Sequence, residues 1–235
     1  MNKRWIKTAA LALFVMTTWS VGAVDTTITA DTLTYNGNED TAQAKGNVVI
    51  TRGTAKMTGA EGIYHFADQS ATLSGSVSYV DGATSLTAAT VTAYADQSLA
   101  ASGGVEMHAE DRTLRGATVT YRPSDGYGTI DGNAYLAVPG TEMTAGHVEA
   151  YVNEIRMIGT GGVSLSHPEQ AFTATADAIT YTQTPGADDG FAVLTGNAHA
   201  VQNGNTLNGP ALEVRLKEQA VETKGRSTLV ISGGR

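Results

Sequence analysis

The chain has 235 residues, of which 41% are hydrophobic, 6% aromatic and 16% charged, with 27 glycines and no cysteine. This length fits one ordinary domain or one elongated repeat domain. A composition rich in Gly, Thr, Ala and Val argues against a helical bundle or coiled coil. The formal net charge of −8 argues against non-specific binding of nucleic acid, which requires neutralisation of phosphates.

The first 23 residues have the pattern of a secretory signal peptide. Three basic residues within the first seven positions precede an uncharged, largely apolar stretch that ends in the small residues Val21-Gly-Ala23. We therefore expect cleavage after Ala23, which leaves residues 24–235 as a single domain. The alternative is an uncleaved anchor, although the uncharged stretch of 17 residues is shorter than the roughly 20 that span a bilayer.

A repeat of about 29 residues runs through the rest of the chain. Most copies have an aliphatic residue just before a tyrosine and, about a dozen residues later, a Gly-x-Val or Gly-x-Ala. The aliphatic positions are Leu33, Ile63, Val91, Val119, Val148, Ile179 and Leu212. The glycines are Gly46, Gly75, Gly103, Gly132, Gly161, Gly196 and Gly225. Seven copies account for nearly all of residues 26–231, as in repeat architectures.

Each copy is expected to supply two short antiparallel strands. Apolar residues alternate after each glycine, as in Val48 and Ile50, so they share one face of a strand. Turn sequences such as Asn36-Gly37 and Asp81-Gly82 separate the strands. Small pairs such as Gly59-Ala60 lie between apolar positions at odd spacing, which predicts a bulge or corner.

The predicted fold is therefore all-β: a folded-over antiparallel β jelly roll or β-solenoid of about 14–16 short strands. A solenoid of this kind has two open ends. The first strand, at residues 26–33, and the last, at residues 227–231, carry no obvious cap and are suited to pairing. Head-to-tail assembly is the hypothesis that follows.

Two stretches resemble the lipopolysaccharide-transport bridge family, the LptA/OstA-like domain of the Gram-negative periplasm. One is Gly46-Asn-Val-Val-Ile-Thr-Arg-Gly-Thr-Ala-Lys-Met57, followed by Ala60-Glu61. The other is Leu194-Thr-Gly-Asn-Ala198 with Gly209 and Val214-Arg-Leu-Lys-Glu-Gln-Ala220. The repeat continues between them, so the resemblance covers about residues 26–231. This chain departs from the family in being longer than a typical bridge and in lacking a Lys-rich tail.

The resemblance implies an open jelly roll that carries lipopolysaccharide with the acyl chains in an apolar groove. It also implies a periplasmic location and end-to-end stacking between a membrane-anchored partner and an outer-membrane barrel assembly. No cofactor is expected, and we predict that the chain is not an enzyme, because the sequence shows no convergent nucleophile, base or metal site. By resemblance and strand phase, the groove candidates are Ile28, Leu33, Val48, Ile63, Val77, Val91, Val105, Val119, Val148, Val163, Ile179 and Leu212. Ile28 and Leu33 are in opposite phase, so both face inward only if the chain bulges near Ala30-Asp31.

Other functions find less support in the residues. The five histidines are scattered without metal-ligand spacing, and the serines lack a G-x-S-x-G elbow. No phosphate-binding G-x-x-x-x-G-K is present. A secreted β-solenoid adhesin or polysaccharide-binding module stays open, because the recurring tyrosines could stack on sugars. A polysaccharide lyase on a parallel β-helix is disfavoured, since no cluster of catalytic charges is apparent.

Overall fold

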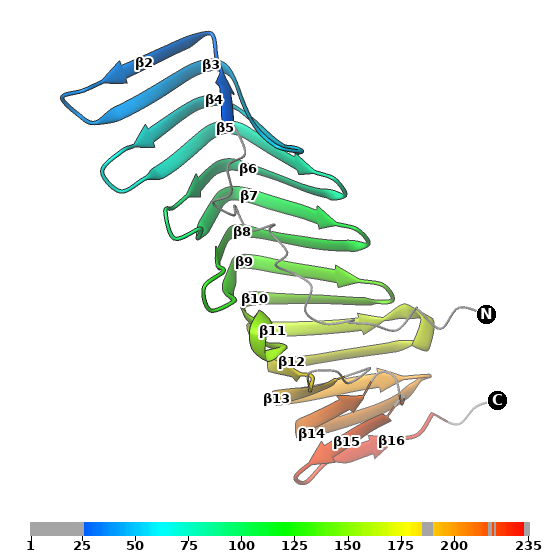
Figure 1. Cartoon of the computed structure of the whole chain (residues 1–235). Coiled ribbons are helices and arrows are strands. Elements are labelled where there is room, and N and C mark those ends of the chain that lie inside the picture. The colour runs from blue at the N-terminus through cyan, green and yellow to red at the C-terminus, as the bar shows by residue number, and fades with distance from the viewer. Residues whose placement is uncertain (1–25, 185–189, 216–217, 219, 233–235) are drawn as a thin grey trace. The chain divides into compact units, whose positions relative to one another are not determined.

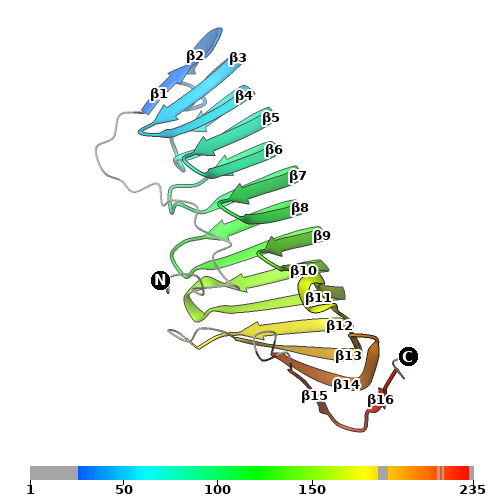
Figure 2. The ribbon, with the colours of Figure 1, turned by 90° about the vertical axis from the view of Figure 1, so that its right-hand side faces the viewer.

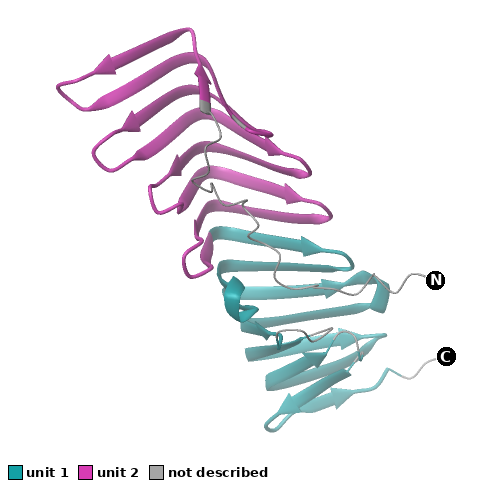
Figure 3. Ribbon diagram, in the orientation of Figure 1, with its two compact units in different colours: residues 1–14, 131–235 teal, residues 15–130 magenta. Residues whose placement is uncertain are grey.

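The computed structural model describes residues 26–184, 190–215, 218 and 220–232. The predicted signal peptide and its cleavage site lie outside these residues. The described chain falls into two compact units, which we call the N-terminal unit (residues 26–130) and the C-terminal unit (residues 131–232) (Figure 3). Within the described residues, no helix has both the length and the apolar character needed to cross a membrane.

Strands dominate both units (Figure 1). The earlier strands are β1 (Thr26–Thr29), β2 (Thr32–Asn36), β3 (Thr41–Arg52), β4 (Ala55–His65), β5 (Ser70–Asp81), β6 (Thr84–Ala93), β7 (Leu99–Ala109), β8 (Arg112–Arg122) and β9 (Tyr127–Val138). The later strands are β10 (Thr141–Tyr151), β11 (Arg156–His167), β12 (Phe172–Thr182), β13 (Phe191–Gln202), β14 (Asn205–Arg215), β15 (Ala220–Lys224) and β16 (Thr228–Val230). Two 3-10 turns, η2 (Val152–Glu154) and η3 (Pro168–Gln170), connect strands of the C-terminal unit.

Hydrogen bonding follows chain order, and the paired strands within each unit are antiparallel. The strands form one open 16-stranded sheet in which β3 to β15 pair with their neighbours in sequence. Both β1 and β2 pair with β3 at one edge, and β16 joins β15 in pairing with β14 at the other. Figure 2 shows the successive strands of each unit side by side. The prediction of a folded-over antiparallel sheet with 14–16 strands is confirmed.

A corner interrupts the long strands at the repeated glycines. Two consecutive residues there have positive φ, as at Gly103 (+83°) and Gly104 (+79°), and the register shifts across them. The corner pairs are Gly46/Asn47, Gly75/Ser76, Gly103/Gly104, Gly132/Asn133, Gly161/Gly162 and Gly196/Asn197. Because two residues face one on the neighbouring strand, each pair is a β-bulge that bends its strand. A bulge or corner was predicted at the small pairs Gly59-Ala60 and Ala88-Ala89. The register shifts there, but the extra residue lies on the neighbouring strand, at Gly75/Ser76 and Gly103/Gly104.

The corner divides each long strand of the N-terminal unit into two parts. We call the part with residues 41–45 of β3 and its paired segments the first arm, and the part with residues 48–52 the second arm. On the first arm, an inner ladder of directly paired residues consists of Leu33, Ala44, Gly62, Leu73, Val91, Ala101 and Val119. On the second arm, the corresponding ladder consists of Ile28, Ile50, Met57, Tyr79, Leu86, Met107 and Leu114.

The C-terminal unit repeats this plan with its own inner ladder. Val148, Gly159, Ile179, Leu194 and Leu212 are paired in succession. All four aliphatic members are buried. Alternation along the strands places Thr, Ser and charged residues on the opposite face, so each unit has an apolar inner side and a polar outer side.

Candidate functional site

An apolar cavity of about 100 Å³ lies within the first strands of the N-terminal unit. Both arms and the corner contribute to its lining, which includes Ile28, Leu33, Val48, Ile50, Leu73 and Val91. Two of these side chains also reach solvent, since Ile28 is 46% exposed and Leu33 is 60% exposed. A cavity of this kind offers a partly open apolar surface, which suits a hydrocarbon ligand better than a polar one.

The hollow arises from two small residues in the first-arm inner ladder. Ala44 of β3 and Gly62 of β4 lie side by side between Leu33 and Leu73. At the position of Gly62, the strands β2, β6, β8, β10, β12 and β14 each have an aliphatic side chain. Ile63, the aliphatic residue of this repeat, lies one position further along. It belongs to the opposite ladder with Gln43 and Thr72, although it still borders the cavity.

A bend in the edge strand brings Ile28 and Leu33 to the same hollow. Strand pairing is interrupted between β1 and β2. Ile28 therefore pairs with Ile50 on the second arm, and Leu33 pairs with Ala44 on the first. Asp31 holds this bend: its N–H donates to the Gly46 carbonyl at 2.8 Å, and its carboxylate accepts from Asn47 Nδ2 at 2.9 Å. The inward placement of both Ile28 and Leu33 depended on an irregularity near Ala30-Asp31, and the structure has an interruption of the edge strand at these two residues.

The twelve predicted groove residues fall into two groups. Those that line the cavity are Ile28, Leu33, Val48, Ile63 and Val91. Those that are buried in the inner packing without lining this cavity are Val77, Val105, Val119, Val148, Val163, Ile179 and Leu212. Lipid contact by either group stays a prediction.

Sequence reasoning missed Gly62 and, on the second arm, Ile50 and Met57 as residues that line the cavity. The signal for Gly62 was a spacing: Val91 follows Gly75 by 16 residues, Val119 follows Gly103 by 16, and the residue 16 positions after Gly46 is Gly62. The predicted groove residue of this repeat, Ile63, follows Gly46 by 17 residues and so departs from the spacing of 16. Ile50 and Met57 were recognised as apolar positions, but nothing in the sequence placed them opposite Leu33.

No curated protein matches this chain by sequence. Among solved structures, the chain is similar to LptH from Pseudomonas aeruginosa, described as the LptA homologous periplasmic component of the conserved lipopolysaccharide transport device. It is 14% identical, and the match covers 89% of this chain and 96% of that chain with a TM-score of 0.19. The family model of the LptA/(LptD N-terminal domain) LPS transport protein matches residues 27–156, more than half of the chain.

The chain belongs to this family. The LptA/LptD N-terminal family is one of lipopolysaccharide transport proteins and not an enzyme family. The matched residues contain the whole of the cavity lining, from Ile28 to Ala93. Among residues 26–184, 190–215, 218 and 220–232, no group of three or more His, Cys, Asp or Glu side chains is arranged to hold a metal ion.

Aromatic residues of this family member gather at the hairpin tips of the first-arm side. Tyr35 and Tyr64 both make edge-to-face contacts with Phe66, with ring centroids 5.7 and 4.9 Å apart. Elsewhere, arginine side chains pack over aromatic rings; for example, the Arg156 guanidinium lies 3.8 Å from the centroid of the Tyr151 ring. The recurring tyrosines therefore do not form one uniform stripe, since Tyr121 is buried and Tyr35 is 67% exposed.

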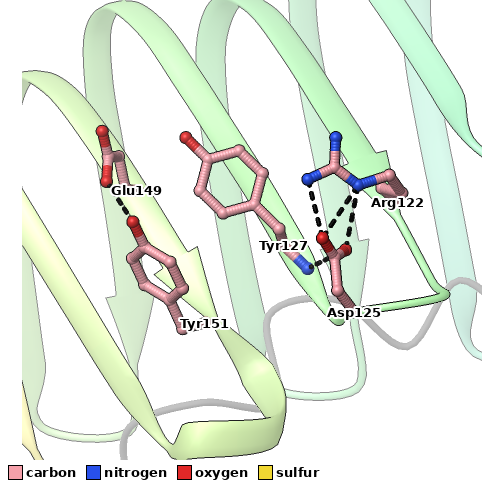
Figure 4. A network of polar contacts seen from close by, with 5 residues as sticks. All are labelled: Arg122, Asp125, Tyr127, Glu149 and Tyr151. Carbon is pink, nitrogen blue, oxygen red and sulfur yellow. Dashed lines mark hydrogen bonds and ion pairs between the residues drawn. The ribbon is translucent and has the colours of Figure 1, made fainter.

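Two polar contacts at hairpin tips are drawn in Figure 4. In the N-terminal unit, Arg122 binds both carboxylate oxygens of Asp125 at 2.7–3.0 Å, and Asp125 also accepts from the Tyr127 N–H. In the C-terminal unit, the Tyr151 hydroxyl donates to Glu149 at 2.7 Å. The hydrogen bonds from Arg122 lower the pKa of Asp125, and burial raises the pKa of the neighbouring Tyr121. The Arg122 cation is thus neutralised by Asp125 at its own hairpin tip.

The Arg122–Asp125 pair predicts a small acid sensitivity. Because the pKa of Asp125 is lowered in the folded state, its contribution is present above the unfolded pKa near 4 and is lost as the pH falls through the lowered value. Asp125→Asn should lower the melting temperature by no more than about 2 °C at pH 6, since the pair is exposed. The difference should vanish in acid, once Asp125 is protonated in both the folded and the unfolded state. Thermal scans against Glu39→Gln, a turn carboxylate, would test this, and an equal shift at pH 6 and in acid would contradict it.

Proposed function

We propose that this chain is a periplasmic carrier and bridge for lipopolysaccharide, in which the apolar inner face shields acyl chains between the inner and outer membranes. Membership of a lipopolysaccharide transport family supports the general role. The observation that carries the finer proposal is the apolar cavity at β1–β6, to which the exposed side chains of Ile28 and Leu33 give access. Residues 1–23 supply export in this proposal, with cleavage after Ala23.

The energetics favour hydrocarbon in this position. Removing one methylene group from water is worth about 0.8 kcal/mol, so even partial shielding of several acyl chains is a strong driving force. Phosphates remain outside, because loss of the three basic residues of the signal peptide changes the formal charge from −8 to −11, which gives anions no attraction. Beyond the cavity, Val77, Val105 and Val119 are packed at 2% exposure or less. Lipid that moves further along this unit therefore has to separate the two arms.

The partners in this proposal bind through the open edges. Within the described chain, β1 and β2 each pair with β3 on one side and with no strand on the other. At the opposite edge of the sheet, β15 and β16 each pair with β14 on one side only. Unpaired backbone is a template for another strand. We assign one edge to a membrane-anchored transport partner and the other to an outer-membrane barrel assembly. Head-to-tail association of this chain uses the same edges.

Lipid mass spectrometry tests the carrier role directly. The protein should be purified without detergent from the periplasm of a lipopolysaccharide-producing host. We expect lipid A species to co-purify, and N-terminal sequencing of the same sample to begin at Val24. A folded protein free of lipid, with no uptake of added lipopolysaccharide, would refute the proposal.

The second candidate is a surface β-solenoid that binds polysaccharide. It is favoured by the exposed aromatic side chains of Tyr35, Phe66 and Tyr94 at the first-arm tips. Glycan-array binding that is lost in Tyr35→Ala and Tyr94→Ala, in a protein without lipid, would support this candidate over the carrier.

A further inference from the structure

Gly62 departs from the pattern of its ladder. The even-numbered strands β2, β6, β8, β10, β12 and β14 place an aliphatic residue at this inner position: Leu33, Val91, Val119, Val148, Ile179 and Leu212. β4 alone among them places glycine there, between Ala44 and Leu73. The cavity of about 100 Å³ lies at this glycine.

Packing does not require a glycine at position 62. A Cβ added there would lie 3.4 Å from Leu73 Cδ1, 3.7 Å from Val48 Cγ1 and 3.8 Å from Ala44 Cβ, all ordinary van der Waals contacts. Gly59 differs, because an added Cβ would lie 2.8 Å from Leu73 Cγ. Gly159, on the inner ladder of the C-terminal unit, likewise has no room for a side chain, because an added Cβ would lie 2.9 Å from Ile179 Cγ2.

The glycine also has a cost for the fold. Glycine inside a strand pays additional backbone entropy and contributes no side chain to the core. An alanine at position 62 would meet both conditions for stabilisation, since it would bury apolar surface and restrict the unfolded chain. A residue that lowers stability where a better one fits indicates that the empty space itself is used.

We infer that Gly62 is a specificity-determining residue, whose missing side chain leaves the seat for the terminal segment of an acyl chain. This inference rests on the proposed carrier function and deepens it. An apolar cavity of about 150 Å³ holds a benzene molecule, so about 100 Å³ suits three or four methylene groups. The seat sets how much hydrocarbon the β1–β6 end of the groove accepts, because Val48 and Leu73 close its inner side.

The test is the displacement of N-phenyl-1-naphthylamine from the purified protein by lipid A and by saturated fatty acids of eight to fourteen carbons. Gly62→Val should weaken lipid A binding about 30-fold, which corresponds to about 2 kcal/mol at 1.4 kcal/mol per tenfold. The fatty-acid length at which affinity stops rising should shorten by three or four carbons. Gly62→Ala should show a smaller loss of about fourfold.

Stability separates this role from a structural one. Gly62→Ala should melt about 2–4 °C higher than the unmodified chain, although it binds lipid less well. Thr90→Val, on the outer face of β6, is the matched control and should bind as the unmodified chain does. Gly62 variants with unchanged affinity and unchanged chain-length preference would overturn the inference alone. An unmodified chain that fails to bind lipid A would overturn the carrier function with it.

Discussion

Replacing Leu33 by aspartate is expected to remove most lipid from this protein while leaving its fold intact. Leu33 lines the cavity yet is 60% exposed, and it lies on the edge strand β2. Hydration of the new carboxylate therefore costs the empty protein little, but an acyl chain in the cavity would remove that water. Loss of the leucine contact and desolvation of the charge together weaken binding by about 3 kcal/mol, or about 100-fold.

Detergent-free purification followed by lipid mass spectrometry would measure the loss. Leu229→Asp is the matched control, because Leu229 is 58% exposed on the edge strand β16 and does not line the cavity. Circular dichroism should show the same strand content in both variants. Equal lipid loss in the two variants would contradict a specific role for the cavity. Val119→Asp is a poorer test, since Val119 is fully buried and a carboxylate there would destabilise the core itself.

The fold could be predicted because its determinants are local and repeated. Corner glycines such as Gly75, Gly103 and Gly132 recur at nearly constant spacing, and alternating apolar residues on either side define the inner face. The sequence did not show that the glycines themselves form the bulge. The bulge was predicted at the small residues opposite, such as Ala88-Ala89. A glycine adopts positive and negative φ with similar ease, so its presence in a sequence does not by itself indicate a left-handed backbone.

The candidate site was harder to predict, because a shift of one residue along β4 decides which side chain faces inward. Ile63 is the conspicuous aliphatic residue of its repeat, but a shift of one position reverses the face of a strand, so Gly62 occupies the inner ladder. An absent side chain is not visible as a motif. The contribution of Ile28 could be anticipated only conditionally, since its direction depends on the bend that Asp31 stabilises through Gly46 and Asn47.

A substitution at the corner should have the largest effect on stability. Gly103 has φ of +83°, and a Cβ added to it would collide with the Cβ of Ala89 on the neighbouring strand β6. Gly104 has nearly the same φ, +79°, but a Cβ added there would meet nothing within 4 Å. The two adjacent glycines therefore separate backbone strain from steric overlap at one corner.

Gly104→Ala should lower the free energy of unfolding by about 1–2 kcal/mol, the cost of a left-handed conformation for an L-residue. Gly103→Ala should cost about 2 kcal/mol more, because Ala89 belongs to a paired strand and cannot move away without breaking the register. Urea titrations monitored by circular dichroism would measure both values. Combining Gly103→Ala with Ala89→Gly should recover the steric part but not the backbone part. Equal destabilisation by the two single substitutions would contradict the close approach of β6 and β7 at this corner.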